Sequence, residues 1–210
     1  MTAMVVLDMN PDLSQSAIVS KQDAYRSSRS RMLVGYKLSL SDLLYTSLMA
    51  SDNRATRALS RTVFGDLNKC VAAMNAKARE LGLVNTRFVE PTGLDAQNVS
   101  TATEVAKIIY YARKYQLIGK ITSTTNYQIR ILNRKQSGRK SITNTNLLTH
   151  SPYNVLAGKT GYISASQYCV ACLLQNREGE RLTVVALGAP GAMTRFREAR
   201  KLLDWGFKQI

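Results

Sequence analysis

Residues 155–166 read VLAGKTGYISAS, in which the tripeptide Lys-Thr-Gly lies between an apolar run and a Tyr-Ile pair. The pattern predicts a strand, with Lys159, Thr160 and Gly161 near its start at the edge of a sheet. A lysine ammonium beside a threonine hydroxyl can hold a carboxylate through charge-assisted hydrogen bonds. Glycine at position 161 lets a substrate backbone lie against the strand, because it carries no Cβ. The stretch therefore predicts the first strand of a sheet and one wall of a site.

Two more strand-like runs follow, QYCVACLLQ at residues 167–175 and RLTVVALGA at residues 181–189. A tight turn around Gly179 joins them, as in an antiparallel pair. The segment TRFREARKLLDWGF, at residues 194–207, has the spacing of an amphipathic helix. The last third of the chain thus predicts a three-stranded antiparallel meander closed by a helix.

Helical patterning dominates the middle of the chain. SLSDLLYTSLMA repeats leucines on one face, with Ser39 or Ser41 as its N-cap. Further helices are expected over about residues 54–63, across DLNKCVAAMNAKARE before Gly82, and across TEVAKIIYYARKY after a capping box that starts at Thr101. NYQIRILNR alternates as a strand, and KQSGRKSITNTN after it is predicted to be a polar loop.

This order of elements predicts an α+β sandwich in a single domain. We expect the helical part at about residues 39–122 and the sheet with its C-terminal helix at about residues 126–210. The opening MTAMVVLDM has no capping residue before it and is predicted to be the end of a helix.

The chain has 210 residues, enough for one core that buries about 70% of the unfolded surface. No apolar run approaches the roughly 18 residues that a membrane helix needs. The first eight residues lack the basic region and cleavage site of a secretory signal. If Met1 is the true start, the sequence by itself predicts a cytosolic protein.

Basic residues outnumber acidic ones, with 29 Lys and Arg against 14 Asp and Glu for a net charge of +15. This charge favours anionic partners: nucleic acid, an acidic membrane surface, or an acidic polymer such as cell wall. The basic residues are scattered, without zinc-finger spacing or an aromatic RNA-binding motif. A solvated basic surface facing an acidic substrate is therefore the preferred interpretation, and no nucleic-acid partner is expected.

Cysteine and histidine usage argues against a disulfide framework and against a metal site. Cys70, Cys169 and Cys172 are odd in number, and His150 is the only histidine. Cys169 and Cys172 have redox-motif spacing, but positions i and i+3 of a strand face opposite sides of the sheet. We expect buried, unpaired thiols and neither a metal nor a cofactor.

Ser51-Asp52-Asn53 is the second motif of interest, just past the helix SLSDLLYTSLMA. These residue types are common at helix ends, so either Ser51 or Asn53 could simply cap the next helix. In combination with Lys159-Thr160-Gly161, however, they form two parts of a three-part signature for acyl-enzyme chemistry, whose third part is Ser-x-x-Lys.

A resemblance extends beyond these tripeptides. SRMLVGYKLSLSDLLYTSLMASDN, MNAKARELGLVNTRFVEPTGLD and GKTGYIS resemble the D-alanyl-D-alanine carboxypeptidase and endopeptidase family of low-molecular-mass penicillin-binding proteins, and within it the penicillin-binding protein 7 type. The similarity covers essentially the whole chain in the same order. It implies a β-lactamase/transpeptidase-like sandwich, hydrolysis of D-alanyl bonds in peptidoglycan, β-lactams as acylating inhibitors and a periplasmic location.

The resemblance also implies roles for six residues. Ser51 would relay a proton, Asn53 would bind the substrate's peptide, and Lys159 would supply positive potential. Thr160 would bind the carboxylate or amide beyond the scissile bond, with Gly161 giving clearance. The backbone N–H of Tyr162 would be one of two oxyanion-hole donors.

The family's Ser-x-x-Lys motif, with its acylated serine, is the departure from the pattern. In the family it ends two residues before the position of Met1, so the resemblance implies an N-terminally truncated and inactive chain that lacks the first strands of the sheet. Ser137-Gly-Arg-Lys140 is a formal match. Its lysine lies in a polar segment and would stay protonated, so Ser137 is not expected to be the nucleophile.

Three alternatives remain open. A non-catalytic relative could bind wall peptides or a partner enzyme. A class A β-lactamase would carry a Glu-x-x-Leu-Asn loop, which Glu90-Pro-Thr-Gly-Leu-Asp95 only half matches. A basic nucleic-acid-binding protein would lose affinity steeply with salt and would not interact with β-lactams.

Overall fold

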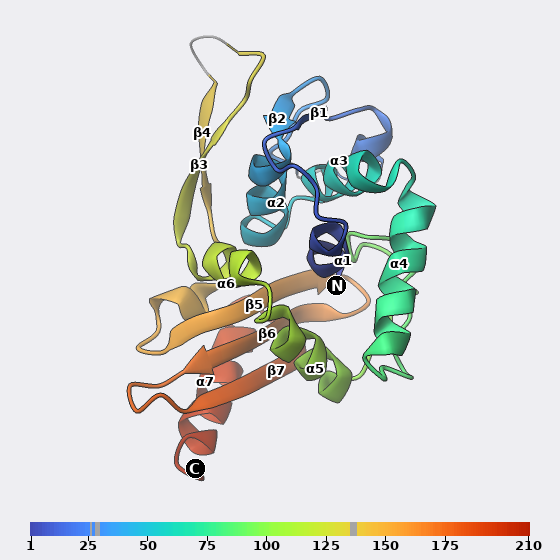
Figure 1. Ribbon diagram of the computed structural model, residues 1–210. Coiled ribbons are helices and arrows are strands. Elements are labelled where there is room, and N and C mark those ends of the chain that lie inside the picture. The colour runs from blue at the N-terminus through green and yellow to red at the C-terminus, as the bar shows by residue number, and fades with distance from the viewer. Residues whose placement is uncertain (26, 28–29, 135–137) are drawn as a thin grey trace.

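The computed structural model describes residues 1–25, 27, 30–134 and 138–210. A layer of helices packs on a layer that contains a three-stranded sheet (Figure 1). The helices of the first layer are α1 (Thr2–Asp8), α2 (Leu40–Met49), α3 (Asn53–Phe64), α4 (Leu67–Glu80), α5 (Ala102–Ala112) and α6 (Gln116–Ser123). The second layer contains β5 (Asn154–Ile163), β6 (Gln167–Gln175), β7 (Arg181–Ala189) and α7 (Thr194–Gly206).

The sheet is the expected antiparallel meander, in the order β5-β6-β7. Lys159 of β5 lies opposite Ala171 of β6, and Cys172 of β6 lies opposite Val184 of β7. Gly179 has φ +89° in the turn between β6 and β7, a left-handed conformation that glycine adopts without strain. Within the described residues β5 pairs with a neighbouring strand on one side only. Helix α6 of the helical layer packs against β5.

Alternation along the strands builds two cores on the two faces of the sheet. Ala157, Ala171 and Leu173 pack toward the helical layer. Val170 and Cys172 point the other way and pack with Phe196 of α7. The expected amphipathic C-terminal helix thus covers one face, while α5 and α6 lie across the other (Figure 1).

Helix α2 lies at the centre of the helical layer, with eight of its ten residues buried. Its N-cap is Ser39, whose Oγ accepts the backbone N–H of Asp42 at 3.0 Å, so Ser41 is not the cap. Gly82 ends the stretch after α4 with φ +67°, as its position predicted. The C-terminus of α2 lies in the middle of the molecule, next to the edge of the sheet.

Two small hairpins complete the fold. β1 (Ser16–Ile18) pairs with β2 (Lys37–Ser39), and η1 (Gln22–Ala24) follows β1. β3 (Asn126–Arg130) pairs with β4 (Arg139–Thr143), and η2 (Leu147–His150) follows β4.

The polar loop predicted for residues 135–146 is wrong at residues 139–143, which form β4. The segment RKSIT offers a single apolar side chain, so its pattern is too weak to indicate a strand. Ile142 is nonetheless fully buried and lies opposite Tyr127, which packs on α2. Ser137, the formal Ser-x-x-Lys serine, lies outside the described residues.

Helix α6 was not anticipated, because the sequence between residues 113 and 123 carries no capping signal. It places Ile118 and Ile121 against β5 and α2. In the part of the chain that the structure describes, each helix is too short or too polar to cross a membrane.

Candidate active site

Ser51 occupies a short connection between α2 and α3, and its backbone has φ +53°. A non-glycine residue in this left-handed region is strained, and such strain gathers at functional sites. The conformation is held by Asp52, which is buried and caps α3. Its carboxylate accepts hydrogen bonds from Ser30 Oγ and from the backbone N–H groups of Arg31, Arg54 and Ala55. The cap of α3 is therefore Asp52, and neither Ser51 nor Asn53 serves that purpose.

Lys159 reaches Ser51 from the edge of β5. Its Nζ donates to Ser51 Oγ at 2.6 Å and to the backbone oxygen of Thr160 at 2.7 Å. Ser51 and Lys159 are 108 positions apart in the sequence, and this hydrogen bond brings their two motifs into contact. Asn53 starts α3 and lines the same cavity as Ser51 and Lys159.

Burial, together with a smaller effect from the nearby positive charge of Arg195, lowers the pKa of Lys159 to about 8. An amine with this pKa exchanges its proton readily near neutral pH. Because the amine already touches a serine hydroxyl, the pair can move a proton to or from a reacting group.

Thr160 is buried, and its Oγ1 lies 2.6 Å from Oγ1 of Thr145. Thr145 follows β4 and is tied to the end of α2, because its N–H and its hydroxyl both donate to the backbone oxygen of Met49. Thr145 therefore links the α2 end to β5, which fixes the direction of the Thr160 hydroxyl. Thr145 carries no signal in the sequence, where it is one of several polar residues in a predicted loop.

Arg195, near the start of α7, supports the other end of the tripeptide from behind the sheet. Its Nη1 donates to the backbone oxygens of Gly161 at 3.0 Å and Cys169 at 3.3 Å, which belong to β5 and β6. The guanidinium lies 5.4 Å from the ring centroid of Tyr168, which in turn contacts the ring of Tyr162. Burial lowers the pKa of Arg195. One sequence signal could have identified it, because Arg195 is an arginine on the buried face of an amphipathic helix.

A cavity of about 300 Å³ opens beside the Ser51–Lys159 pair. Its polar wall carries Ser51, Asn53 and Lys159, and Met74 and Phe88 contribute to its apolar wall. The backbone loop at residues 90–93 closes one side. The site thus combines a half-buried cation, a hydroxyl pair and a sheet edge around one partly open cavity, as a small peptide ligand requires.

Comparisons with known proteins identify the family of this chain. The family model described as D-alanyl-D-alanine carboxypeptidase matches residues 1–191. The chain belongs to this family. It is 35% identical over 208 residues to a D-alanyl-D-alanine endopeptidase of Pseudomonas aeruginosa and 35% identical over 210 residues to one of Escherichia coli, covering 98% of this chain in both. It spans 66% of the length of each of these two relatives.

Solved structures of the family are similar as well. A Streptomyces DD-transpeptidase superposes with a TM-score of 0.89 at 26% identity, over 99% of this chain and 84% of that one. A D-alanyl-D-alanine carboxypeptidase from Mycobacterium tuberculosis gives a TM-score of 0.87 at 28% identity, over 99% of this chain and 78% of that one. The expected α+β fold of low-molecular-mass penicillin-binding proteins is therefore confirmed.

Gly158, just before the Lys-Thr-Gly tripeptide, and Gly161, its last residue, have different surroundings. A Cβ on Gly158 would lie 2.8 Å from Asn146 Nδ2 and 2.8 Å from Cys172 Sγ, so the chain itself requires glycine there. A Cβ on Gly161 would meet only Cys169, at an ordinary 3.8 Å. The packing of the chain therefore leaves room for a side chain at position 161. Tyr162 follows with half of its side chain exposed.

Cysteines and carboxylates offer no metal centre among the described residues. The three thiols are unpaired, with Cys70 and Cys172 buried and Cys169 partly exposed. Burial raises the pKa of Cys172 to about 12, so this thiol stays protonated and packs as a small apolar side chain.

Proposed function

We propose that this chain forms part of a serine-type D-alanyl-D-alanine peptidase that cleaves peptidoglycan peptides in the periplasm through an acyl-enzyme, and so remodels the cell wall. The 2.6 Å hydrogen bond between Lys159 Nζ and Ser51 Oγ carries the proposal, since it joins the two signature motifs. The two 35% identical relatives are endopeptidases, which favours cleavage of cross-bridges over removal of a terminal residue.

The position of each site residue suits it to a different role in this reaction. Ser51 and Lys159 relay a proton between the reacting groups, because the lysine has a pKa of about 8 and donates directly to the serine. Thr160 binds the carboxylate or amide beyond the scissile bond. Its hydroxyl donates to Thr145, so its Oγ1 can accept an amide N–H as it stands and can donate to a carboxylate once it turns away from Thr145. Asn53, which lines the same cavity as Ser51 and Lys159, binds the peptide of the substrate.

Gly161 and Tyr162 contribute through the backbone. The free edge of β5 lets the substrate lie beside Gly161 in extended form, as an added strand would. The N–H of Tyr162 serves as one oxyanion-hole donor in this proposal, where a preorganised dipole stabilises the developing negative charge.

The acylated serine is not assigned to any of the 210 residues. The single Ser-x-x-Lys ends on Lys140, whose Nζ donates to the backbone oxygen of Arg31 at 2.8 Å. That amine is engaged on the β3–β4 hairpin and is not directed at Ser51. We therefore expect the 210-residue chain to bind D-alanyl peptides without hydrolysing them.

Hydrolysis of β-lactams is not included in the proposal. Glu90, in the position that half resembles the water-activating glutamate of class A β-lactamases, has its carboxylate occupied by its own loop. It accepts hydrogen bonds from Thr92 Oγ1, from the N–H groups of Thr92, Gly93 and Leu94, and from Asn98 Nδ2. A carboxylate whose oxygens accept this many hydrogen bonds from its own loop shapes that loop and is not positioned to activate a water.

Intact-mass spectrometry after incubation with benzylpenicillin tests the proposal. The 210-residue chain is compared with a chain extended upstream in its native reading frame. We expect an adduct on the extended chain alone. An adduct on the short chain would contradict the assignment and place the nucleophile within residues 1–210.

Binding of an N-acetylated D-alanyl-D-alanine peptide, measured by calorimetry, accompanies the mass spectra. If neither chain is acylated but both bind the peptide, the non-catalytic wall-binding alternative replaces the peptidase. If neither is acylated and neither binds, the proposed function is wrong.

A further inference from the structure

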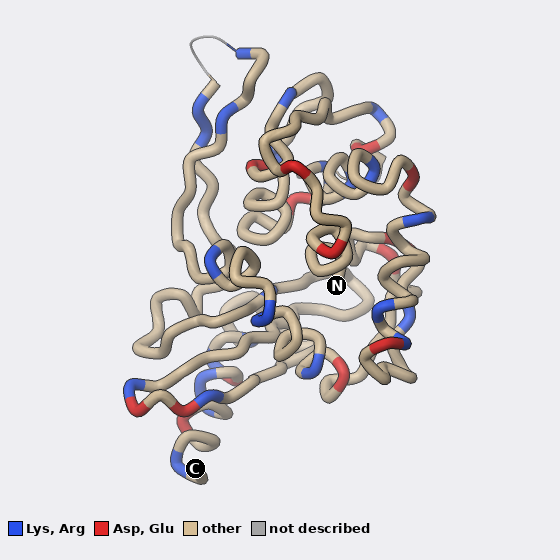
Figure 2. Tube along the Cα trace, in the orientation of Figure 1, with Lys and Arg blue, Asp and Glu red and all other residues tan. Residues whose placement is uncertain are grey.

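The β3–β4 hairpin stands away from the body of the molecule and carries a concentration of positive charge (Figures 1 and 2). Beyond the paired strands, the backbone N–H of Ile131 still donates to the oxygen of Gly138 at 2.6 Å. The neighbouring strand β2 joins the hairpin through Leu132, whose N–H donates to the oxygen of Lys37 at 2.7 Å. We call the following basic residues the hairpin patch: Lys37, Arg130, Arg134, Arg139 and Lys140.

Acidic side chains do not balance the hairpin patch. Between Glu104 and Glu178 the sequence contains neither aspartate nor glutamate. The carboxylate of Asp42 reaches the hairpin, but it is buried and accepts the backbone N–H of Arg130 at 3.1 Å. Among the described residues, no salt bridge involves a member of the patch.

Arg130 and Arg139 lie directly opposite each other in the β3–β4 register, and both are exposed. Like charges at directly opposed positions destabilise a sheet. An exposed hairpin needs only polar side chains at such positions, and Gln128 opposite Ser141 one step along the strands meets that need. Two opposed guanidiniums instead form a pair of forks that suits planar anions such as carboxylates.

The hairpin patch is connected to the candidate active site through β4. Two residues after β4 ends at Thr143, Thr145 contacts Thr160. From Arg139 to Thr145 the chain runs roughly 20 Å, at about 3.3 Å per extended residue. A single short peptide bound at Thr160 does not reach the patch, whereas a polymer that carries repeated carboxylates can contact both.

We propose that the hairpin patch binds carboxylates of neighbouring peptides on the same peptidoglycan strand whose D-alanyl peptide occupies the Ser51–Lys159 site. This inference rests on the proposed function and adds a second contact with the polymer. The patch strengthens binding to polymeric peptidoglycan and leaves binding of short peptides unchanged.

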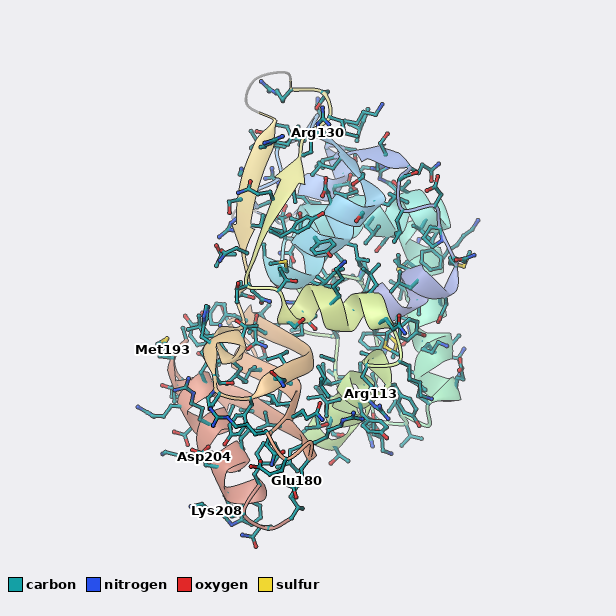
Figure 3. All side chains as sticks on the ribbon, turned by 60° about the vertical axis from the view of Figure 1, so that its left-hand side comes forward. Arg113, Arg130, Glu180, Met193, Asp204 and Lys208 are labelled. Carbon is teal, nitrogen blue, oxygen red and sulfur yellow. The ribbon has the colours of Figure 1, made fainter. Side chains whose placement is uncertain are left out.

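The test compares two double variants of the full chain in co-sedimentation with lipid-free peptidoglycan sacculi. Arg130→Gln with Arg139→Gln removes two charges from the hairpin patch. Arg177→Gln with Arg181→Gln removes two exposed charges at the other end of the molecule, next to Glu180 (Figure 3). We expect at least a tenfold loss of affinity, about 1.4 kcal/mol, for the hairpin variant at low salt and less than twofold for the control.

Equal losses for both variants would overturn the inference, because they would indicate general charge attraction. Unchanged binding of the hairpin variant would also overturn it. Sacculi whose carboxylates have been amidated serve as the second ligand, and we expect the difference between the variants to vanish on them. A hairpin-dependent affinity that is higher for duplex DNA or for anionic vesicles than for sacculi would assign the patch to phosphates and overturn the inference.

Calorimetry with the short D-alanyl peptide separates this inference from the proposed function. We expect the hairpin variant to bind the short peptide as the unchanged chain does. Loss of short-peptide binding in the hairpin variant would overturn the inference. If the unchanged chain binds sacculi in a hairpin-dependent way but binds no short peptide, the proposed function is wrong and the inference loses its premise.

Discussion

Two groups of cations in this protein have opposite surroundings. Lys159 lies in a site where Ser51, Thr160 and Thr145 share hydrogen bonds, and burial lowers its pKa to about 8. Arg130 and Arg139 are exposed on a hairpin and have no carboxylate partner among the described residues. A half-buried cation with a lowered pKa can donate and accept a proton, whereas exposed cations keep their charge and attract anions from a distance.

Among the tests of this comparison, Asp52→Ala is expected to have the largest effect, because it disrupts the turn that positions Ser51 beside Lys159. Asp52 is buried, and its carboxylate accepts hydrogen bonds from four donors around the Ser51 turn, one hydroxyl and three backbone N–H groups. Leaving those donors without an acceptor should lower the free energy of unfolding by about 2–4 kcal/mol. Urea unfolding measures it, with Asp95→Ala as a control in the exposed turn at residues 95–97. A decrease in the free energy of unfolding below 1 kcal/mol would show that the Ser51 turn is stable without the Asp52 carboxylate.

Lys159→Ala should weaken binding of the short D-alanyl peptide by about 10- to 100-fold, because it removes a charged hydrogen-bond donor worth about 1.5–3 kcal/mol. Calorimetry measures the affinity, and Lys114→Ala removes an equal charge from the end of α5 as the control. Equal affinity in both variants would place the peptide elsewhere on the molecule.

The same lysine predicts a pH dependence of stability. Its folded-state pKa of about 8 lies below the unfolded value of 10.5, so the unfolded chain binds more protons between these pH values. The free energy of unfolding contributed by Lys159 therefore rises from pH 8 to 10.5, and Lys159→Met should remove that rise. Tyr127, whose pKa burial raises to about 12, acts in the opposite direction above pH 10, so the difference between the two chains is the quantity to measure.

Thr145→Val should cost about 1 kcal/mol of stability and about fivefold in short-peptide affinity, because Thr160 loses the partner that orients its hydroxyl. Thr145→Ser retains the hydroxyl and should restore the affinity. If serine fails to restore it, the methyl group of Thr145 matters more than the hydrogen bond.

The smallest expected effect lies on the hairpin. Replacing Arg130 and Arg139 with glutamine removes a like-charge pair and should raise the free energy of unfolding by a few tenths of a kcal/mol. The increase should shrink in high salt, which screens exposed charges. A loss of stability instead would mean that the two arginines support the hairpin.

The sequence predicted those parts of the fold whose patterns are periodic and strong. The meander was recoverable because β5, β6 and β7 are short apolar runs separated by turn residues, as expected for strands covered on both faces. Strand β4 was not, because its burial depends on Ile142 meeting Tyr127 and α2, a contact between distant segments. Helix α6 escaped for a similar reason, since packing on β5 rather than a local capping signal stabilises it.

The candidate site divides in the same way. Ser51, Asn53 and Lys159 belong to short motifs that chemistry ties together, so they could be selected before their contact was known. Thr145 and Arg195 act through Thr160 and Gly161, and such supporting positions have no motif of their own. They are defined by neighbours that only the folded chain brings together.

The left-handed backbone of Ser51 has a consequence for the history of this chain. Glycine adopts that conformation freely, so Ser51→Gly would relieve strain while removing the hydroxyl that Lys159 contacts. Stability and chemistry therefore exert opposite selection on one codon. A lineage that had stopped using the site would gain stability by drifting to glycine at this position. Serine at position 51 is the residue that continued use of the site would maintain.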